Sequence, residues 1–144
     1  MKVFFDTSVL VAACIESHPE HIRSFRSLQR VKNDNWEMVV ATHTLAELYA
    51  VLTRVPIRPQ IAPAIARRII KDNVETIANI KSISTQRYKT VLDEMASRNL
   101  SGGIIYDALA ASIAVAENVD VLLTLNRKDF LRVWSLDESI IREP

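Results

Sequence analysis

The chain has 144 residues, of which 49% are hydrophobic and 24% are charged, and its formal net charge is +1. This composition can build a substantial core, so it indicates a globular protein and excludes a disordered one. A nearly neutral chain carries no general signal for nucleic-acid binding, and any such function must come from local groups of residues.

Three features of the sequence predict a cytoplasmic protein that is not bound to a membrane. The single cysteine, Cys14, cannot form an internal disulfide, and it lies in an apolar stretch that is typical of a buried thiol. Only three apolar residues separate Lys2 from Asp6, so the N-terminal segment does not resemble a signal peptide. We also find no uncharged apolar stretch long enough for a transmembrane helix.

Strands and helices are expected to alternate along the chain. Short apolar runs such as Val3–Phe5 and Met38–Ala41 predict strands buried on both faces, and apolar residues three or four positions apart predict amphipathic helices. In chain order we expect a strand at 3–5, helices at 8–15 and from about 19 to 32, a strand at 38–41, helices at 42–52 and 61–71, a strand near 75–83, helices at 86–98 and 105–117, a strand at 120–124, a short helix at 128–131 and a strand at 133–136.

This order of elements predicts an α/β fold. The segment near 75–83 alternates only in part, and its length leaves its assignment as a strand open. The pair Gly102-Gly103 marks the clearest turn. The expected architecture is a three-layer sandwich in which a central, mainly parallel sheet is flanked by helices. We find no repeat and no linker, and we expect a single domain over residues 1–144.

Acidic and amide side chains follow the predicted strands. Asp6 comes directly after the first strand, Glu47 lies in the helix after the second, and Asp107 begins the alanine-rich helix. Asn126 and Asp129 follow the strand at 120–124. Functional groups of an open parallel sheet gather beyond the carboxyl ends of its strands. We therefore expect these four segments to converge.

Each of these residues also has a purely structural interpretation. Asp6 can cap the following helix, Thr44 and Glu47 match a capping box, Asp107 can complement a helix dipole, and Asp129 can be a solvated surface residue. Taken together, these alternatives are weaker. Glu47 and Asp107 lie in apolar segments, where acids are rarely left without a partner.

A cluster of carboxylates needs a compensating charge. Two unit charges about 4 Å apart repel each other by about 4 kcal/mol at an effective dielectric constant near 20. The cluster must therefore take up protons, basic partners or a divalent cation. Oxygen ligands favour Mg²⁺ or Mn²⁺, and such a site suits the hydrolysis of phosphodiester bonds.

Four segments of the sequence carry a family resemblance. They are "DTSVL" at 6–10, "TLAELYAVLTR" at 44–54, "YDALAASIA" at 106–114 and "LLTLNRKDF" at 122–130. In this order they resemble the four acidic motifs of PIN-domain ribonucleases, and they are most similar to those of VapC-type toxins of toxin–antitoxin pairs. The resemblance spans nearly the whole chain.

The resemblance implies an endoribonuclease that depends on Mg²⁺ or Mn²⁺. Asp6 and Asp107 would be the main metal ligands, and Glu47 would complete the triad and orient the attacking water. The fourth position of the family, acidic in many members, falls on Asn126, which is neutral. Asp129 would then supply the missing charge one helical turn later. The resemblance further implies an RNA substrate, a cognate antitoxin protein and a homodimer.

Further side chains are expected to take part in binding. The hydroxyls of Thr7, Ser8 and Thr124 are candidates to hold a metal-bound water or a phosphate. Arg54, just past the helix that carries Glu47, is a candidate to approach the substrate.

The histidines and the two basic helix faces have alternative interpretations. His18 and His21 are expected to be surface residues, whereas His43, four residues before Glu47, is either structural or part of the same cleft. Two basic sets can bind RNA phosphate or simply form solvated faces. These sets are Arg23, Arg26 and Arg30, and Arg67, Arg68 and Lys71.

Three other functions compete with the ribonuclease. The neutral Asn126 is compatible with a catalytically weak PIN-like module that binds RNA or a protein. A phosphatase of the haloacid dehalogenase type also has a strand followed by Asp, but it needs a second Asp where Ser8 stands. A receiver domain needs a lysine on a late strand, and "DVLLTLN" has none.

Overall fold

A five-stranded parallel sheet is the centre of the structure. The computed structural model describes residues 1–134 and 137–144, and within them the strand order is β3-β2-β1-β4-β5. All four strand pairs are parallel. The strands are β1 (Lys2–Phe5), β2 (Glu37–Ala41), β3 (Ala78–Lys81), β4 (Val121–Leu123) and β5 (Ile141–Arg142).

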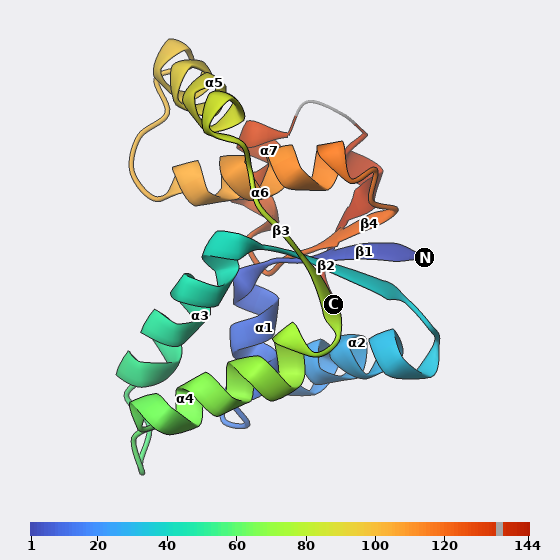
Figure 1. Cartoon of the computed structure of the whole chain (residues 1–144), viewed down its shortest axis with the longest axis vertical. Coiled ribbons are helices and arrows are strands. Elements are labelled where there is room, and N and C mark those ends of the chain that lie inside the picture. The colour runs from blue at the N-terminus through green and yellow to red at the C-terminus, as the bar shows by residue number, and fades with distance from the viewer. Residues whose placement is uncertain (135–136) are drawn as a thin grey trace.

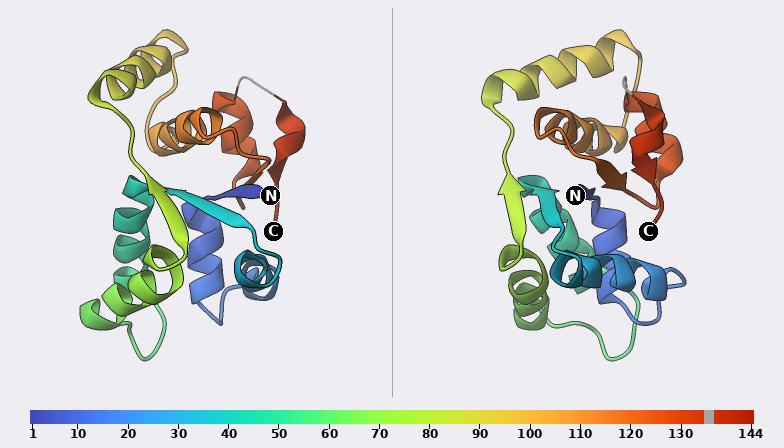
Figure 2. Two further views of the ribbon diagram at one scale, coloured as in Figure 1. Left: turned by 45° about the vertical axis from the view of Figure 1, so that its right-hand side comes forward. Right: turned by 90° about the vertical axis from the view of Figure 1, so that its right-hand side faces the viewer.

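Helices cover both faces of this sheet and complete three layers (Figures 1 and 2). One face is covered by α1 (Thr7–Cys14), α2 (His21–Asn33), α3 (Thr42–Arg54) and α4 (Pro63–Ile70). The other face is covered by α6 (Ile104–Ala116) and α7 (Arg127–Val133), and α5 (Thr85–Ser97) packs on the outside of α6. Two short elements complete the chain, the π-helical η1 (Lys71–Glu75) and the 3₁₀-helical η2 (Glu138–Ile140).

The core is divided between the two faces by the two-residue period of the strands. Along β1, Val3 and Phe5 pack toward α1–α4, and Phe4 packs toward α6 and α7. All three side chains are completely buried. The strands of the interior therefore need apolar residues at every position, because successive side chains enter opposite layers that are both covered. This is the reason for the unbroken apolar runs in the sequence.

The strand order reverses at the carboxyl end of β1. The chain proceeds from β1 to β2 and β3 on one side of β1, and then crosses over to β4 and β5 on its other side. Such a reversal separates the connections above β1 and β4, and ligands of open α/β sheets bind in the opening that this leaves. Phe5 is paired with Leu123 at this end, so the segments after β1 and β4 start side by side.

The predicted α/β sandwich with a parallel central sheet is confirmed, but two strand predictions were wrong in extent. The segment near 75–83 contains only the four-residue β3, because η1 continues the helical chain through Glu75 and buries Val74. The strand expected at 133–136 does not begin at Val133, which ends α7, and positions 135 and 136 lie outside the described residues. The last strand is β5, where buried Ile141 pairs with Leu122.

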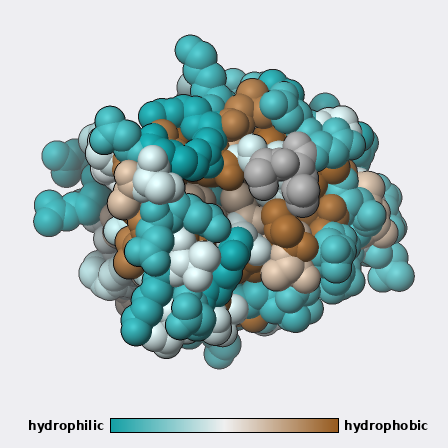
Figure 3. All heavy atoms as spheres, turned by 90° about the horizontal axis from the view of Figure 1, so that it is seen from above, coloured by the Kyte–Doolittle hydropathy of each residue, from teal (hydrophilic) through white to brown (hydrophobic). Residues whose placement is uncertain are grey.

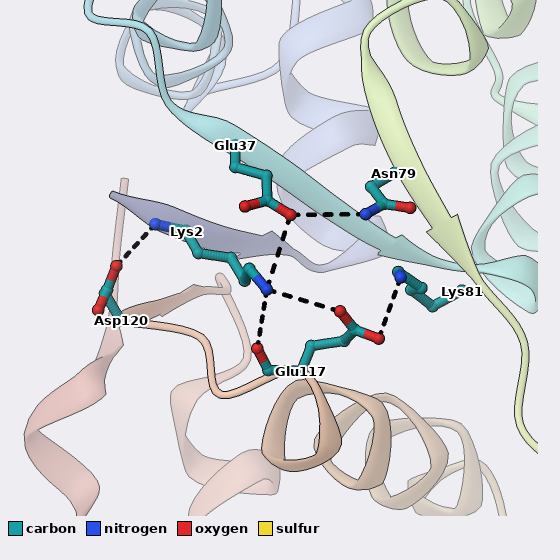
Figure 4. A network of polar contacts seen from close by, with 6 residues as sticks. All are labelled: Lys2, Glu37, Asn79, Lys81, Glu117 and Asp120. Atoms are coloured by element: carbon teal, nitrogen blue, oxygen red, sulfur yellow. Dashed lines mark hydrogen bonds and ion pairs between the residues drawn. The ribbon is translucent and has the colours of Figure 1, made fainter.

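A network of ion pairs fixes the C-terminal end of α6 to the sheet (Figure 4). Lys2 Nζ donates to the Glu117 carbonyl oxygen at 3.1 Å and lies 3.6 Å from Glu37 and 3.7 Å from the Glu117 carboxylate. The other carboxylate oxygen of Glu117 lies 3.2 Å from Lys81 Nζ on β3. A cation at the last carbonyls of a helix also complements its dipole. The network therefore holds α6 against β1, β2 and β3.

The described part of the chain contains no helix with the length and apolar character that crossing a membrane requires.

We predict that Glu117→Gln lowers the free energy of unfolding by about 1 kcal/mol, because it removes two partly buried ion pairs. Urea titration measures the change, and the loss shrinks at high salt as the ion pairs are screened. The matched control is Glu16→Gln in the exposed loop after α1. Equal effects of the two substitutions would contradict a role of the network.

Candidate active site

Asp6 directly follows β1, and its side chain caps α1. Its backbone N–H donates to the Leu123 carbonyl at 3.0 Å, which continues the ladder between β1 and β4. Its Oδ2 accepts hydrogen bonds from the Ser8 N–H, the Ser8 hydroxyl and the Thr124 hydroxyl. Among the described residues no hydrogen bond reaches Oδ1. One carboxylate oxygen therefore stabilises the fold, and the other is free of such bonds.

The hydroxyls of Ser8 and Thr124 join the loop after β4 to Asp6. Thr124 is completely buried, and its Oγ1 donates to Asp6 at 2.9 Å and accepts from the Asn126 N–H at 2.9 Å. The Ser8 hydroxyl accepts from the Leu125 N–H at 3.0 Å. Both hydroxyls thus fix the direction of the Asp6 carboxylate, where the sequence analysis expected them on a water or a phosphate.

Glu47 points toward the turn that follows β1. The capping-box interpretation of Thr44 and Glu47 is wrong, because α3 begins at Thr42 and Thr44 is buried inside the helix. Glu47 Oε1 instead accepts a hydrogen bond from the Thr7 hydroxyl at 3.1 Å. Burial raises the pKa of Glu47, the charge of Asp6 raises it further, and the bond from Thr7 partly offsets both.

Asp107 lies in the first turn of α6, and the charges of the other carboxylates act on it. Its pKa is raised to about 7, first by burial and then by the charges of Asp6, Asp129 and Glu47. These four acids come from four separate segments: the residue after β1, the second turn of α3 and the first turns of α6 and α7. The charges of the other three act on Asp107, and that the four form one functional site stays a prediction.

The remaining candidates lie at the edge of this acidic cluster. Asn126 is the exposed N-cap residue of α7, and its side chain makes no cap hydrogen bond. Asp129 is partly buried in the first turn of α7, 3.7 Å from Arg132. Arg54 is exposed at the end of α3, two helical turns and about 10 Å from Glu47 on the same side of the helix. Arg54 therefore lies outside the acidic cluster, on the side of α3 that also carries Glu47.

His43 and Tyr106 border the cluster, and their contact with each other was not predicted from the sequence. The imidazole Nε2 of His43 lies 3.7 Å from Glu47 Oε1, and its ring centroid lies 6.0 Å from that of Tyr106. Burial lowers the pKa of His43, whereas a hydrogen bond to the Tyr106 backbone and the charge of Asp6 favour its charged form. Two features of the sequence could have indicated this pair. His43 lies four residues before Glu47, and the aromatic Tyr106 directly precedes Asp107.

The other histidines and the basic sets have partners of their own. His18 Nδ1 accepts from the Glu20 N–H, and His21 Nδ1 contacts the Ala12 carbonyl, so both stabilise the start of α2. Most members of the basic sets form ion pairs on exposed helix faces, which favours the interpretation as solvated faces. These pairs are Arg23 with Glu20 and Glu143, Arg30 with Asp34, Arg67 with Glu75, and Arg68 with Asp72.

The donor set fits a hydrated divalent cation better than a metal held by protein alone. Carboxylate and amide oxygens are the ligands that Mg²⁺ and Mn²⁺ prefer. Among the described residues no group of three or more His, Cys, Asp and Glu side chains is gathered closely enough to hold a metal by itself. Mg²⁺ commonly uses one or two carboxylates and fills its other positions with water and substrate phosphate. An open cluster with one free oxygen on Asp6 suits that mode.

A family model for the PIN domain matches residues 3–134. The chain belongs to the PIN-domain family. The resemblance to VapC-type ribonucleases is also confirmed by two relatives from Mycobacterium tuberculosis. "Ribonuclease VapC40" is 32% identical over 117 residues, which are 81% of each chain. "Ribonuclease VapC27" is 32% identical over 123 residues, which are 83% of this chain and 80% of the relative.

Two solved structures share the fold of this PIN domain. One is described as VapC20 of Mycobacterium tuberculosis, a toxin that cleaves the sarcin-ricin loop; its TM-score is 0.72 at 12% identity, covering 92% of this chain and 96% of that one. The other is described as VapBC2 from Rickettsia felis bound to a DNA fragment from its promoter; its TM-score is 0.66 at 23% identity, covering 99% and 98%. At these identities the likeness establishes the parallel three-layer fold.

We predict that Asp107→Asn stabilises the metal-free protein, and more so at high pH. The folded state holds the Asp107 proton up to about pH 7, whereas the unfolded chain releases it near its ordinary pKa, so stability declines as the pH rises between these values. Removing the charge is expected to stabilise by about 1 to 2 kcal/mol near pH 8, discounted because the carboxyl is partly exposed, and by less near pH 5.

Urea titrations in EDTA at the two pH values measure this difference. The control is Asp93→Asn on the exposed face of α5, away from the cluster. A gain for Asp107→Asn that does not depend on pH would contradict the electrostatic coupling of the four acids.

Proposed function

We propose that this PIN domain is a metal-dependent endoribonuclease that hydrolyses phosphodiester bonds of RNA, with Mg²⁺ or Mn²⁺ as its cofactor. The observation that carries the proposal is the acidic cluster, in which the charges of Asp6, Asp129 and Glu47 act on Asp107. The two relatives named as ribonucleases support RNA as the substrate class. In this proposal residues 1–144 act as one nuclease domain.

The proposed roles follow from charge and position. Asp6 and Asp107 hold the cation directly, Glu47 completes the triad through a water molecule, and Asp129 supplies the charge that the neutral Asn126 lacks. When bound, a divalent cation lowers the pKa of a water molecule and offsets the negative charge of the phosphate. The Thr7 hydroxyl fixes the position of Glu47. Glu47 accepts a proton from the attacking water while the oxygen of that water bonds to phosphorus. The phosphorus–oxygen bond to the leaving ribose breaks, and the leaving oxygen takes a proton from solvent.

The hydroxyls of Ser8 and Thr124 act as positioning groups in this proposal. They hold Asp6 Oδ2, so the free oxygen keeps a constant direction toward the cluster. Because the same hydroxyls accept hydrogen bonds from Leu125 and Asn126, they also keep the loop that leads to Asp129 close to Asp6.

We further propose that the protein is the toxin of a toxin–antitoxin pair, with an antitoxin protein as partner, and that it forms a homodimer. The VapBC2 complex, of similar fold, supports an antitoxin. Exposed apolar side chains are available for protein contacts, with Ile65 on α4 and Tyr88 and Leu92 on α5. On the face over α5, hydrophobic residues lie between hydrophilic ones, which cover most of the surface (Figure 3).

A catalytically weak module that binds RNA or a protein is the second candidate function. The neutral and exposed Asn126 favours it, because a site with fewer charges holds a cation less firmly. The two candidates differ in one result, which is cleavage of RNA that requires metal.

We predict that the purified protein cuts a mixture of structured RNAs in Mn²⁺ or Mg²⁺ and not in EDTA. Asp6→Asn and Asp107→Asn are each expected to slow cleavage by about 100-fold or more, since each removes a negative ligand for the cation. Asp93→Asn is the charge-matched control, and circular dichroism checks that each variant is folded. A variant that cuts at the wild-type rate would refute the assigned site, and RNA binding without cutting would favour the binding module.

We also predict that Arg54→Ala weakens RNA binding by about threefold to tenfold and lowers the salt dependence of binding by about one counter-ion. The physical reason is that Arg54 lies two turns beyond Glu47 on the same side of α3. There it can contact a phosphate that flanks the one to be cut. The matched control is Arg26→Ala on the exposed face of α2. Filter binding over a salt series measures both quantities, and an unchanged salt dependence would exclude a phosphate contact.

A further inference from the structure

An exposed aromatic ring stands beside the acidic cluster. Tyr106 is 47% exposed although it lies in the first turn of α6, directly before Asp107. Packing in the hydrophobic core therefore does not explain the position of its ring.

His43 supports the ring from α3. The two ring centroids are 6.0 Å apart at an interplanar angle of 42°. The other end of the imidazole lies 3.7 Å from Glu47. Tyr106 thus contacts a ring that itself lies beside Glu47, and this contact places the exposed aromatic surface next to the acids.

The chemistry of the cluster explains the need for such a surface. Carboxylates repel the phosphates of RNA, and the chain as a whole has a net charge of only +1, so general electrostatic attraction contributes little here. Stacking of a base on an aromatic ring gives affinity without charge and tolerates any base sequence. A base inside a duplex has both faces covered by its neighbours, whereas an unpaired base can turn out and stack on a side chain.

We propose that Tyr106 stacks on an unpaired base next to the phosphate that is cut, with His43 as the support of its ring. This inference rests on the proposed ribonuclease function and adds a base-binding residue to its site. Tyr106 is a binding residue in this scheme, and His43 is a positioning residue that acts through it.

The first experiment compares steady-state cleavage of a single-stranded RNA oligonucleotide by the full chain and its variants. Tyr106→Ala is expected to raise KM by roughly fivefold or more while kcat changes less, and Tyr106→Phe is expected to stay within about twofold, because the ring and not the hydroxyl stacks. Tyr88→Ala on α5 is the matched control, since Tyr88 is 40% exposed and remote in sequence from the acidic segments.

The second experiment moves one abasic nucleotide through the positions that flank the cut. Wild type is expected to lose affinity when the abasic site falls at one particular position, and this penalty is expected to vanish in Tyr106→Ala. A penalty that persists in the variant would overturn the stacking. So would a higher KM for Tyr106→Ala without any position-dependent penalty, which would assign the ring to another role such as a protein contact.

The failure of this inference is distinct from the failure of the proposed function. If wild type cuts no RNA in either metal, the ribonuclease proposal fails. If wild type cuts and Tyr106→Ala matches it in KM and in the abasic series, only the stacking fails.

Discussion

Repulsion among carboxylates at the carboxyl end of the sheet is the constraint on which this structure depends. Burial and the charges of Asp6, Asp129 and Glu47 raise the pKa of Asp107 to about 7, so the fold places these acids together at a cost in free energy. Buried packing on both faces of the sheet offsets this cost, with Phe4 and Phe5 completely enclosed. A proton on Asp107 or a divalent cation relieves the repulsion directly.

Hydrogen bonds and ion pairs hold the acids in place against that repulsion. Within the cluster, Ser8 and Thr124 bind Asp6, and Thr7 binds Glu47. At the end of α6 that is remote from the cluster, the network around Lys2 and Glu117 fixes the C-terminus of the helix. A helix of 13 residues is a rod of about 20 Å, so anchoring its far end limits how far Asp107 can swing away from the cluster.

The sequence predicted the parts of the fold that local patterns determine. The apolar runs at 3–5 and 38–41 became β1 and β2, and the geometry of parallel strands predicted that the segments after β1 and β4 start side by side. Short peripheral strands such as β3 and β5 carry too few residues for a clear pattern. Side-chain partners depend on tertiary contacts, so the bond from Thr7 to Glu47 replaced the local capping box, and the contact of His43 with Tyr106 needed the spatial neighbourhood of α3 and α6.

Asp6 shows how a structural and a functional interpretation of one residue can both hold. Its Oδ2 caps α1 and joins the loop after β4, but a neutral Asn would cap a helix about as well as Asp. An Asn at this position would also remove one charge from the repelling cluster and so favour folding. The negative charge of Asp6 therefore has no structural necessity within the described contacts. A positively charged ligand at the free Oδ1 would give this charge a purpose, as in the cation site proposed above.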